Sequence, residues 1–410
     1  MMQLFNTGMD YLKIDVASNF GLDKKTWNQR IEWFNANEHQ LDVLIPQADS
    51  PALFYAGIQA YRKALANEAT GYPISLDATS SGLQILACLT GDRKAAELCN
   101  VLNFSEDDVV QRRDGYTVIY NAMTTKIGES SKIKRDDVKQ AIMTALYGSE
   151  AVPKQVFGEG LLLSIFEETM AEMAPAAWGL NKAYLTMWNP EAFCNSWTLP
   201  DNFHVHVKVM SPEVETVHFL NEPIDIQRYV NKPMSEGRSL GANTTHSIDG
   251  MVVREMVRRC NYDADQVRMI RKMIEEVEAG YSPSVIADDK AELLTVLMKH
   301  YEYSGFLSAR VLDVLDYTNI MSVPSLEPIK ELLASLPKKP FKVIAIHDCF
   351  RCLANYGNDL RQQYNFILRD IAKSDLLSYM LSQLLGRYVP IEKEDPDMWK
   401  EIADAEYALS

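Results

Sequence analysis

The sequence lacks the features that mark several large classes of protein. No apolar run reaches the roughly 18 residues that a membrane-spanning helix needs. The first residues, MMQLFNTGMDYLKID, lack the basic-then-apolar pattern of a secretory signal. Six cysteines are too few for a disulfide framework in 410 residues. We therefore expect a protein of the reducing cytoplasm with no membrane partner.

Basic charge is also scarce. The chain has 41 Lys and Arg against 56 Asp and Glu, a net charge of −15. A protein that coats nucleic acid needs a basic surface to neutralise phosphates, so that class is disfavoured. An enzyme whose basic groups line one cleft is not excluded, although part of its grip on nucleic acid must then come from elsewhere. The sequence also has no glycine-rich phosphate loop, internal repeat or low-complexity tract.

Apolar spacing predicts long helical blocks between a few strands. The helical blocks are residues 11–70, 80–190 and 246–335. GYPISLD and PFKVIAIHDCFRCLA favour strands, the second with a turn inside it, and alternation at 197–235 favours hairpins. Because these strands come from distant parts of the chain, we expect an α+β fold whose sheet is assembled non-locally.

Two aspartates stand where predicted strands end. Asp77 closes GYPISLD just before a helical segment, and Asp348 follows His347 at the turn between two strands. Each alone has an ordinary explanation, since Asp often caps helices and occupies turns. Together they are what a pair of Mg²⁺ ions requires, because hard cations prefer oxygen ligands and can clamp the oxygens of a phosphoryl transfer.

The segment KIKRDDVKQAIMTALYGS carries a pattern with a step of four. The residues in that step are Arg135, Lys139, Met143 and Tyr147. On a helix they lie along one slowly turning stripe, with two cations at one end and Tyr147 beside Gly148 at the other. The cations can hold a triphosphate and the aromatic ring can stack on a base. Taken alone, the pattern also fits a solvated basic face with a buried tyrosine.

Three motifs in this order resemble motifs A, B and C of the single-subunit RNA polymerases of phages and mitochondria. They are DATSSG, RDDVKQAIMTALYG and HDCF, and the second fits R-x3-K-x3-M-T-x2-Y-G at every specified position. The segments YLKIDVASNFGLDK, QADSPALF and NTTHSIDG are similar to flanking segments of that family. The resemblance therefore covers nearly the whole chain.

The resemblance implies a right-hand polymerase palm, built on an antiparallel sheet, with mainly α-helical fingers. The expected parts are 1–70 (helical palm-flanking segment), 71–92 (palm with motif A), 93–245 (fingers, with a hairpin region at 197–235) and 246–410 (palm with motif C). A helical insertion is expected at about 260–339, because 100 residues separate His246 from His347 where the family has a short spacer. The hairpin that would read promoters, at about 205–235, looks short.

The resemblance also implies roles for the metal-binding and phosphate-binding residues. Asp77 and Asp348 would bind two Mg²⁺ ions, with the carbonyl of Ala78 as an extra ligand. Arg135 and Lys139 would hold the incoming triphosphate, with Lys13 as a helper. Gln140 stands where family members often carry Arg, so one phosphate contact would be lost.

Other residues would select the nucleotide. Tyr147 would lie under the nascent base pair and, with His246, sense the ribose 2′-hydroxyl, while Gly148 would let the helix end pack close to the template. Related DNA polymerases have Glu at the position of Gly82, where its bulk excludes a 2′-hydroxyl, and Glu in place of Cys349. Both differences favour ribonucleotides.

The function expected from the resemblance is template-directed RNA synthesis. The 3′-hydroxyl of the RNA attacks the α-phosphate of an NTP and pyrophosphate leaves, catalysed by Asp77, Asp348, Lys139 and Tyr147. The alternatives are a related DNA polymerase and a degenerate polymerase fold that only binds nucleic acid.

The expected partners are a DNA template, the RNA product, NTPs and a second protein subunit. The thumb, the N-terminal domain and the family's upstream Gly-Arg motif are missing before Lys13, so a smaller and more basic chain would supply them. The resemblance is thus to the catalytic large subunit of a split, heterodimeric phage polymerase. The compartment would be the host bacterial cytoplasm if a phage encodes the chain.

Overall fold

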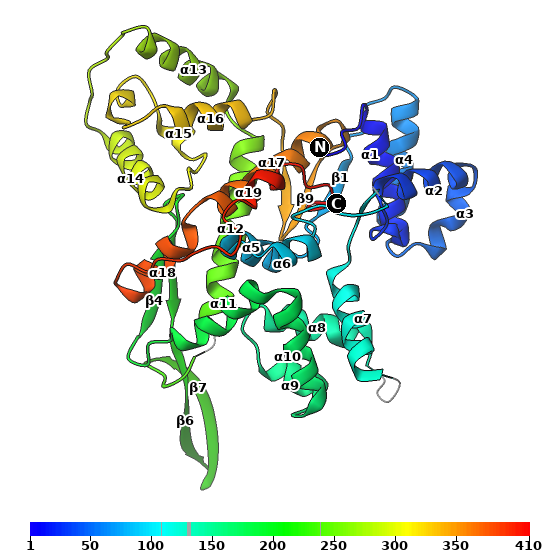
Figure 1. Cartoon of the computed structure of the whole chain (residues 1–410), viewed down its shortest axis with the longest axis vertical. Coiled ribbons are helices and arrows are strands. Elements are labelled where there is room, and N and C mark those ends of the chain that lie inside the picture. The colour runs from blue at the N-terminus through cyan, green and yellow to red at the C-terminus, as the bar shows by residue number, and fades with distance from the viewer. Residues whose placement is uncertain (108, 129–132, 238) are drawn as a thin grey trace.

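The computed structural model describes residues 1–107, 109–128, 133–237 and 239–410 (Figure 1). These residues form a mixed fold of many helices and small antiparallel sheets, which confirms the predicted α+β class. In this part of the chain, no helix has the length and apolarity required to cross a membrane.

The central sheet has three antiparallel strands in the order β1-β9-β8. The strands are β1 (Pro73–Asp77), β8 (Ile344–Ile346) and β9 (Cys349–Leu353). Asp77 pairs with Cys349, so the end of β1 lies beside the β8–β9 turn. His347 in that turn has φ 56°, a left-handed conformation that a two-residue hairpin connection requires. The predicted strands, the turn and the non-local sheet are confirmed.

Helices cover the sheet and position its ends. The helices around it are α1 (Gly8–Ala17), α2 (Trp27–Asn37), α3 (Leu41–Leu44), α4 (Pro51–Leu65), α5 (Ser81–Thr90), α12 (Ser239–Cys260), α17 (Gly357–Lys373), α18 (Leu376–Leu385) and α19 (Trp399–Ile402). Every residue of α5 is buried, and this helix packs against α12 and α17. Because α5 begins four residues after β1 ends, the loop between them is held over the core.

Asp15 joins α1 to β1. Its carboxylate is 2% exposed and accepts hydrogen bonds from the Ser75 backbone N–H (2.8 Å) and the Tyr72 hydroxyl (2.7 Å). Burial raises the pKa of Asp15 to about 6. Asp15 thus supplies an acceptor for the Ser75 N–H on the edge of β1 that faces away from β9.

A second group of helices follows α5. It consists of α6 (Arg93–Leu98), α7 (Gly115–Ile127), α8 (Arg135–Ala145), α9 (Ala151–Phe157), α10 (Leu161–Met173) and α11 (Pro175–Thr186), with a small sheet of β2 (Phe104–Glu106) and β3 (Val109–Gln111). Helix α8 ends at Ala145, so Tyr147 lies in the turn beyond it and Gly148 continues the turn with φ 82°. The predicted stripe therefore runs past the end of its helix.

Two hairpins occupy the region predicted to contain them. The first is β4 (Cys194–Thr198) with β5 (His204–Lys208), and the second is β6 (Met210–Phe219) with β7 (Glu222–Asn231). The longer hairpin projects away from the rest of the molecule (Figure 1).

Helices after α12 surround a hydrophobic core of their own. They are α13 (Ala264–Glu278), α14 (Asp289–Ser304), α15 (Val311–Val314) and α16 (Glu327–Ser335). Short 3₁₀ segments occur at Glu38–Gln40, Ile45–Gln47, Ile320–Ser322 and Ala354–Tyr356, and a π-helical turn at Ser18–Leu22. Figure 1 places α13 to α16 together at one end of the molecule, far from α7 to α10.

A buried ion network links this second core to α12 and α17. Glu255 on α12 is fully buried and accepts hydrogen bonds from the Ser308 hydroxyl and the Ala309 backbone N–H. It also pairs with the buried Arg259, whose guanidinium lies 2.9 Å from the carboxylate of Asp370 on α17. The second core is thus joined to α12 and α17 through Glu255 and Arg259, each of which has more than one partner.

Candidate active site

A cavity of about 230 Å³ lies where β1, α5, α8 and the β8–β9 turn meet. Its lining consists of Ala78, Thr79, Ser80, Ser81, Gly82, Tyr116, Lys139, Met143, Leu146, Tyr147 and Asp348. Six of these were singled out from the sequence, namely Ala78, Gly82, Lys139, Met143, Tyr147 and Asp348. The three motifs therefore converge on one hollow.

The two aspartates are neighbours, and Asp348 lines the cavity. Asp77 is the last residue of β1, and the backbone N–H of Ala78 donates to the carbonyl oxygen of Asp348 (3.1 Å). Burial raises the pKa of Asp348, and the negative charge of Asp77 raises it further. The two carboxylates therefore repel each other, and a cation between them would relieve that repulsion.

The donor set fits hard divalent cations. The ligands available are the carboxylate oxygens of Asp77 and Asp348 and the carbonyl of Ala78, which are the oxygen donors that Mg²⁺ prefers. In the described residues, no group of three or more His, Cys, Asp or Glu side chains is arranged to enclose a metal.

Asp249 is a third carboxylate near the turn, and sequence reasoning missed it. It lies on α12, and burial together with the charge of Asp348 raises its pKa to about 6. The available signal was its spacing, because Asp249 follows His246 by three residues and so lies on the same helix face.

Tyr147 is packed between Gly82 and His246. Its ring centroid lies 4.4 Å from that of His246. A Cβ added at Gly82 would come within 2.7 Å of the Tyr147 hydroxyl oxygen, so any side chain there would displace the ring. Burial raises the pKa of Tyr147 to about 12, so the hydroxyl keeps its proton as a donor. Ser81, which lines the same cavity, was not predicted as a site residue.

Lys139 enters the cavity from α8 and is exposed. Its ammonium lies 5.5 Å from the ring centroid of Tyr116, a third residue that the motif analysis missed. The Tyr116 hydroxyl is 3.2 Å from that of Ser80, so this ring links the loop after β1 to the lysine.

Two of the predicted phosphate contacts do not line the cavity. Arg135 pairs with Asp114 and donates from Nε to the Thr117 hydroxyl (2.7 Å) on α7. Lys13 donates to the Asn35 side chain (2.8 Å) on α2. Both cations are held by neighbouring helices in this structure.

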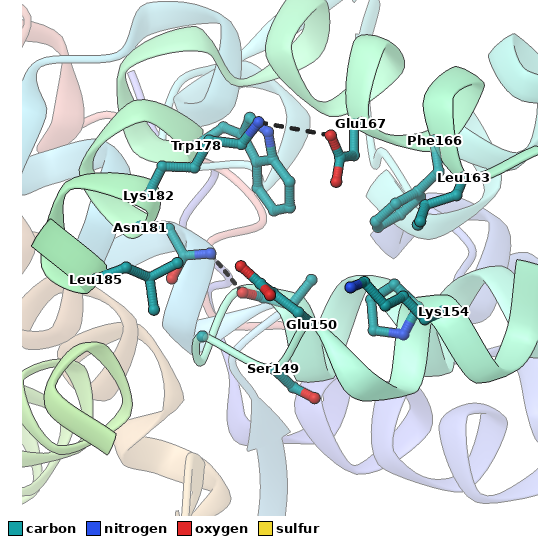
Figure 2. Close-up of a pocket in the computed structure, with 13 residues that line it drawn as sticks. Ser149, Glu150, Lys154, Leu163, Phe166, Glu167, Trp178, Asn181, Lys182 and Leu185 are labelled. Atoms are coloured by element: carbon teal, nitrogen blue, oxygen red, sulfur yellow. Dashed lines mark hydrogen bonds and ion pairs between the residues drawn. The ribbon is translucent and has the colours of Figure 1, made fainter. Parts of the chain in front are cut away.

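A second cavity, of about 250 Å³, lies on the other side of the α8 terminus, and Gly148 lines it (Figure 2). Phe166 and Trp178 contribute aromatic walls, and the Asn181 side chain donates to the carbonyl of Ala145. Trp178 Nε1 and Asn181 Oδ1 are buried without a hydrogen-bond partner in the described part of the chain. The cavity is thus lined by aromatic and polar residues beside the end of α8.

Comparison with known proteins gives the same family as the motifs. Residues 2–157 match the family described as DNA-dependent RNA polymerase. The chain is 32% identical over 166 residues to a probable DNA-directed RNA polymerase of Neurospora crassa, covering 36% of this chain and 18% of that protein. It is 31% identical over 172 residues to a probable DNA-directed RNA polymerase of Podospora anserina, covering 34% and 18%. The match spans about a fifth of each relative.

Residues 2–157, which contain β1, α5 and α8, are therefore similar in sequence to nucleic-acid polymerases. More specifically, this region is similar to DNA-directed RNA polymerases, which confirms the predicted resemblance to the single-subunit, phage and mitochondrial type. His246, Asp249 and Asp348 lie outside the matched region, and the fold brings them to it.

Proposed function

We propose that this chain carries the catalytic part of a DNA-directed RNA polymerase, which adds ribonucleoside monophosphates from NTPs to an RNA 3′ end. The observation that supports this most is the single cavity at which Asp348 joins the loop after Asp77 and the end of α8. Asp77 and Asp348 are 271 positions apart in the sequence, so only a specific fold places both at one site.

Asp77 and Asp348, with the carbonyl of Ala78, would hold two Mg²⁺ ions. When bound, such ions stabilise the charge on the attacking and leaving oxygens of an in-line displacement. Lys139, which is exposed and lines the same cavity as Asp348, would orient the triphosphate. Arg135 would contact the triphosphate only after leaving Asp114, and Lys13 only after leaving Asn35.

Selection of ribose would fall to Tyr147 and His246. The Tyr147 hydroxyl lies over Gly82, where a side chain would push the ring away. A site built to hydrogen-bond a 2′-hydroxyl discriminates against the sugar lacking it, because its own polar group is then left unpaired. Met143 and Gly148 would border the base pair and the template strand.

Each part of the chain has a proposed role in this polymerase. Residues 71–92 and 246–410 would form the palm, with an insertion at about 260–339. Residues 93–245 would form the fingers and 1–70 a flanking support. We also propose a more basic companion polypeptide that completes the grip on the RNA–DNA hybrid, since a net charge of −15 leaves little basic surface for it.

The test is extension of a preformed RNA–DNA scaffold in Mg²⁺, with rNTPs or dNTPs offered separately. We expect a ladder of products with rNTPs and at most traces with dNTPs. Efficient extension with dNTPs alone would favour the DNA polymerase. If the chain binds the scaffold but does not extend it, even with a companion polypeptide present, the chain would be a polymerase fold that only binds nucleic acid.

A further inference from the structure

Gln84, on α5, is a fully buried amide with four hydrogen-bond partners. Its Nε2 donates to the Thr79 hydroxyl (3.1 Å), the Cys99 carbonyl (3.0 Å) and the Ala408 carbonyl (2.8 Å). Its Oε1 accepts from the Tyr364 hydroxyl (2.6 Å). Because carbonyl oxygens can only accept, the amide fits in one orientation. A buried amide with this many partners is held rigidly in place.

Thr79 joins this amide to the loop between β1 and α5. Its hydroxyl donates to the Cys99 carbonyl (2.7 Å) and accepts from Gln84, so both of its roles as donor and acceptor are used. Asp77 and Ala78 directly precede Thr79 in the chain. A fixed Thr79 therefore limits the backbone rotations that aim the carboxylate of the first and the carbonyl of the second.

Tyr364 connects the same amide to the other half of the site. It lies on α17, which follows β9, and its ring centroid is 5.8 Å from that of Phe350 on β9. Burial first, and then the charges of Asp249 and Asp348, raise the pKa of Tyr364 well above its usual value. The hydroxyl therefore keeps its proton for the hydrogen bond to Gln84. Through this bond, the loop after β1 is connected to the helix that supports β9.

A buried glutamine can also serve only to hold helices together, and the chain contains one for comparison. Gln363, on α17, is 2% exposed and donates to the Ser335 carbonyl (2.7 Å) at the end of α16, in the second core. Gln84 differs because its partner Thr79 lines the cavity of the candidate active site. The contacts of Gln84 thus end at the site, whereas that of Gln363 ends at the second core.

We propose that Gln84 is a positioning residue for the metal site, acting through Thr79 on the loop that carries Asp77 and the Ala78 carbonyl. This rests on the proposed function, because it takes those oxygens as ligands of divalent cations. Residues that orient metal ligands typically contribute about 10–100-fold to metal affinity. Gln84 is not among the residues that line the cavity, so its loss should weaken cation binding without removing a ligand.

The experiment titrates the full chain with Mn²⁺, a paramagnetic substitute for Mg²⁺, and measures free Mn²⁺ by electron paramagnetic resonance. No nucleotide or nucleic acid is present, so the result does not depend on RNA synthesis. Binding that is lost in Asp348→Asn identifies the site among the weaker ones of an acidic chain. The test variant is Gln84→Met, which keeps the length of the side chain and removes its hydrogen bonds. Gln363→Met is the matched control.

We expect the Mn²⁺ dissociation constant of this site to rise about tenfold in Gln84→Met and to stay at the wild-type value in Gln363→Met. Thr79→Val should raise it as well, whereas Thr79→Ser, which keeps the hydroxyl, should restore wild-type Mn²⁺ affinity. In scaffold extension, Gln84→Met should need more Mg²⁺ for its half-maximal rate and should approach the wild-type rate at saturating Mg²⁺. Urea unfolding shows separately how much stability each variant has lost.

Unchanged Mn²⁺ affinity in folded Gln84→Met, or equal losses in Gln84→Met and Gln363→Met, would overturn the positioning role and make Gln84 a packing residue. If Gln84→Met does not fold, equal Mn²⁺ affinities of Thr79→Val and Thr79→Ser would overturn it. A wild type without any binding that depends on Asp348 would be a different failure. It would remove the metal assignment itself, and the positioning role with it.

Discussion

Asp348 has two constraints that few surface aspartates share. It follows a left-handed residue in a two-residue turn, and it is half-buried beside a second carboxylate. The turn was predictable from alternation on both sides of His347–Asp348. The proximity of Asp249 was missed, although its spacing of three from His246 put both residues on one face of α12.

Asp348→Asn and Asp77→Asn should each abolish nucleotide addition while leaving the fold intact. Each change removes a charge where transition-state charge develops, so we expect the extension rate to fall by at least about 10²-fold. The measurement is single-nucleotide extension of a preformed scaffold in Mg²⁺. Glu302→Gln, which removes an exposed carboxylate from α14, should extend like the wild type. Near-normal rates in either Asp variant would rule out the metal assignment.

Tyr147→Phe should relax the choice of sugar. The ring can stay against His246 and Gly82, but its hydroxyl can no longer bond to a 2′-hydroxyl, so we expect the rNTP/dNTP preference to fall by roughly tenfold or more. Competition between the two nucleotides on one template measures this ratio. Tyr388→Phe, at a tyrosine that is 78% exposed, serves as the control. An unchanged rNTP/dNTP preference in Tyr147→Phe would mean that Tyr147 only packs against its neighbours and does not select the sugar.

At the scale of elements, the strands were easier to predict than the ends of the helices. Alternating apolar residues identify β1, β8, β9 and both longer hairpins, because burial on one face imposes a period of two. The end of α8 was missed, since the spacing of four continues through Tyr147 although the helix stops at Ala145. Gly148 in its left-handed conformation was the available stop signal.

The Asp15 contact between α1 and β1 should make stability depend on pH. The pKa of Asp15 is about 6 in the folded protein, above its ordinary value of 3.8, so the folded state binds the proton more tightly. The stability contributed by the protonated carboxyl is present at low pH and is lost as pH rises through about 4 to 6. Over this window the loss is at most roughly 3 kcal/mol.

Comparison with Asp15→Asn isolates this effect, because the variant carries no ionisable group there. Between pH 4.5 and pH 7.5, the wild type should lose stability relative to Asp15→Asn in urea unfolding. An equal difference between the two proteins at both pH values would contradict the assignment.

The buried ion network predicts a large effect of one substitution on the second core. Glu255→Ala leaves the buried Arg259 with one carboxylate fewer and removes the acceptor for Ser308, so we expect a loss of about 3–5 kcal/mol in the free energy of unfolding. Thermal and urea unfolding measure it. Glu278→Ala, at a surface carboxylate that pairs with Lys330, should change stability by less than about 1 kcal/mol. Equal losses in the two variants would mean that Glu255 does not join the second core to α12.

At the scale of the whole molecule, net charge limits how the chain holds nucleic acid. With −15 overall, we expect the isolated chain to bind an RNA–DNA scaffold with a dissociation constant weaker than about 1 µM at physiological salt. Fluorescence anisotropy across a range of salt concentrations tests this, and the slope of log affinity against log salt gives the number of phosphates neutralised. Nanomolar binding by the isolated chain at 150 mM salt would argue against a need for a basic companion.

The family was predictable from local motifs, but the arrangement of the site was not. Motif B specifies a helix, a lysine and a tyrosine at fixed spacing, and these reach the cavity as predicted. The positions of Arg135 and Lys13 depend on Asp114 and Asn35, which belong to other helices and carry no motif. Contacts of that kind depend on packing between distant segments, which spacing within one segment cannot reveal.

The order of strands in the central sheet also determines when, during synthesis of the chain, Asp77 and Asp348 can come together. Among the described strands, β1 pairs with β9, and the Asp77 backbone also exchanges hydrogen bonds with that of Ser410. Asp348 is added 271 residues after Asp77, which takes roughly 15–50 s at bacterial rates of translation. During that interval β9 is not yet made and the backbone groups of β1 could join another chain, except where Asp15 already accepts the N–H of Ser75. A nascent chain released before β9 would lack the aspartate pair, so unfinished products should be catalytically silent.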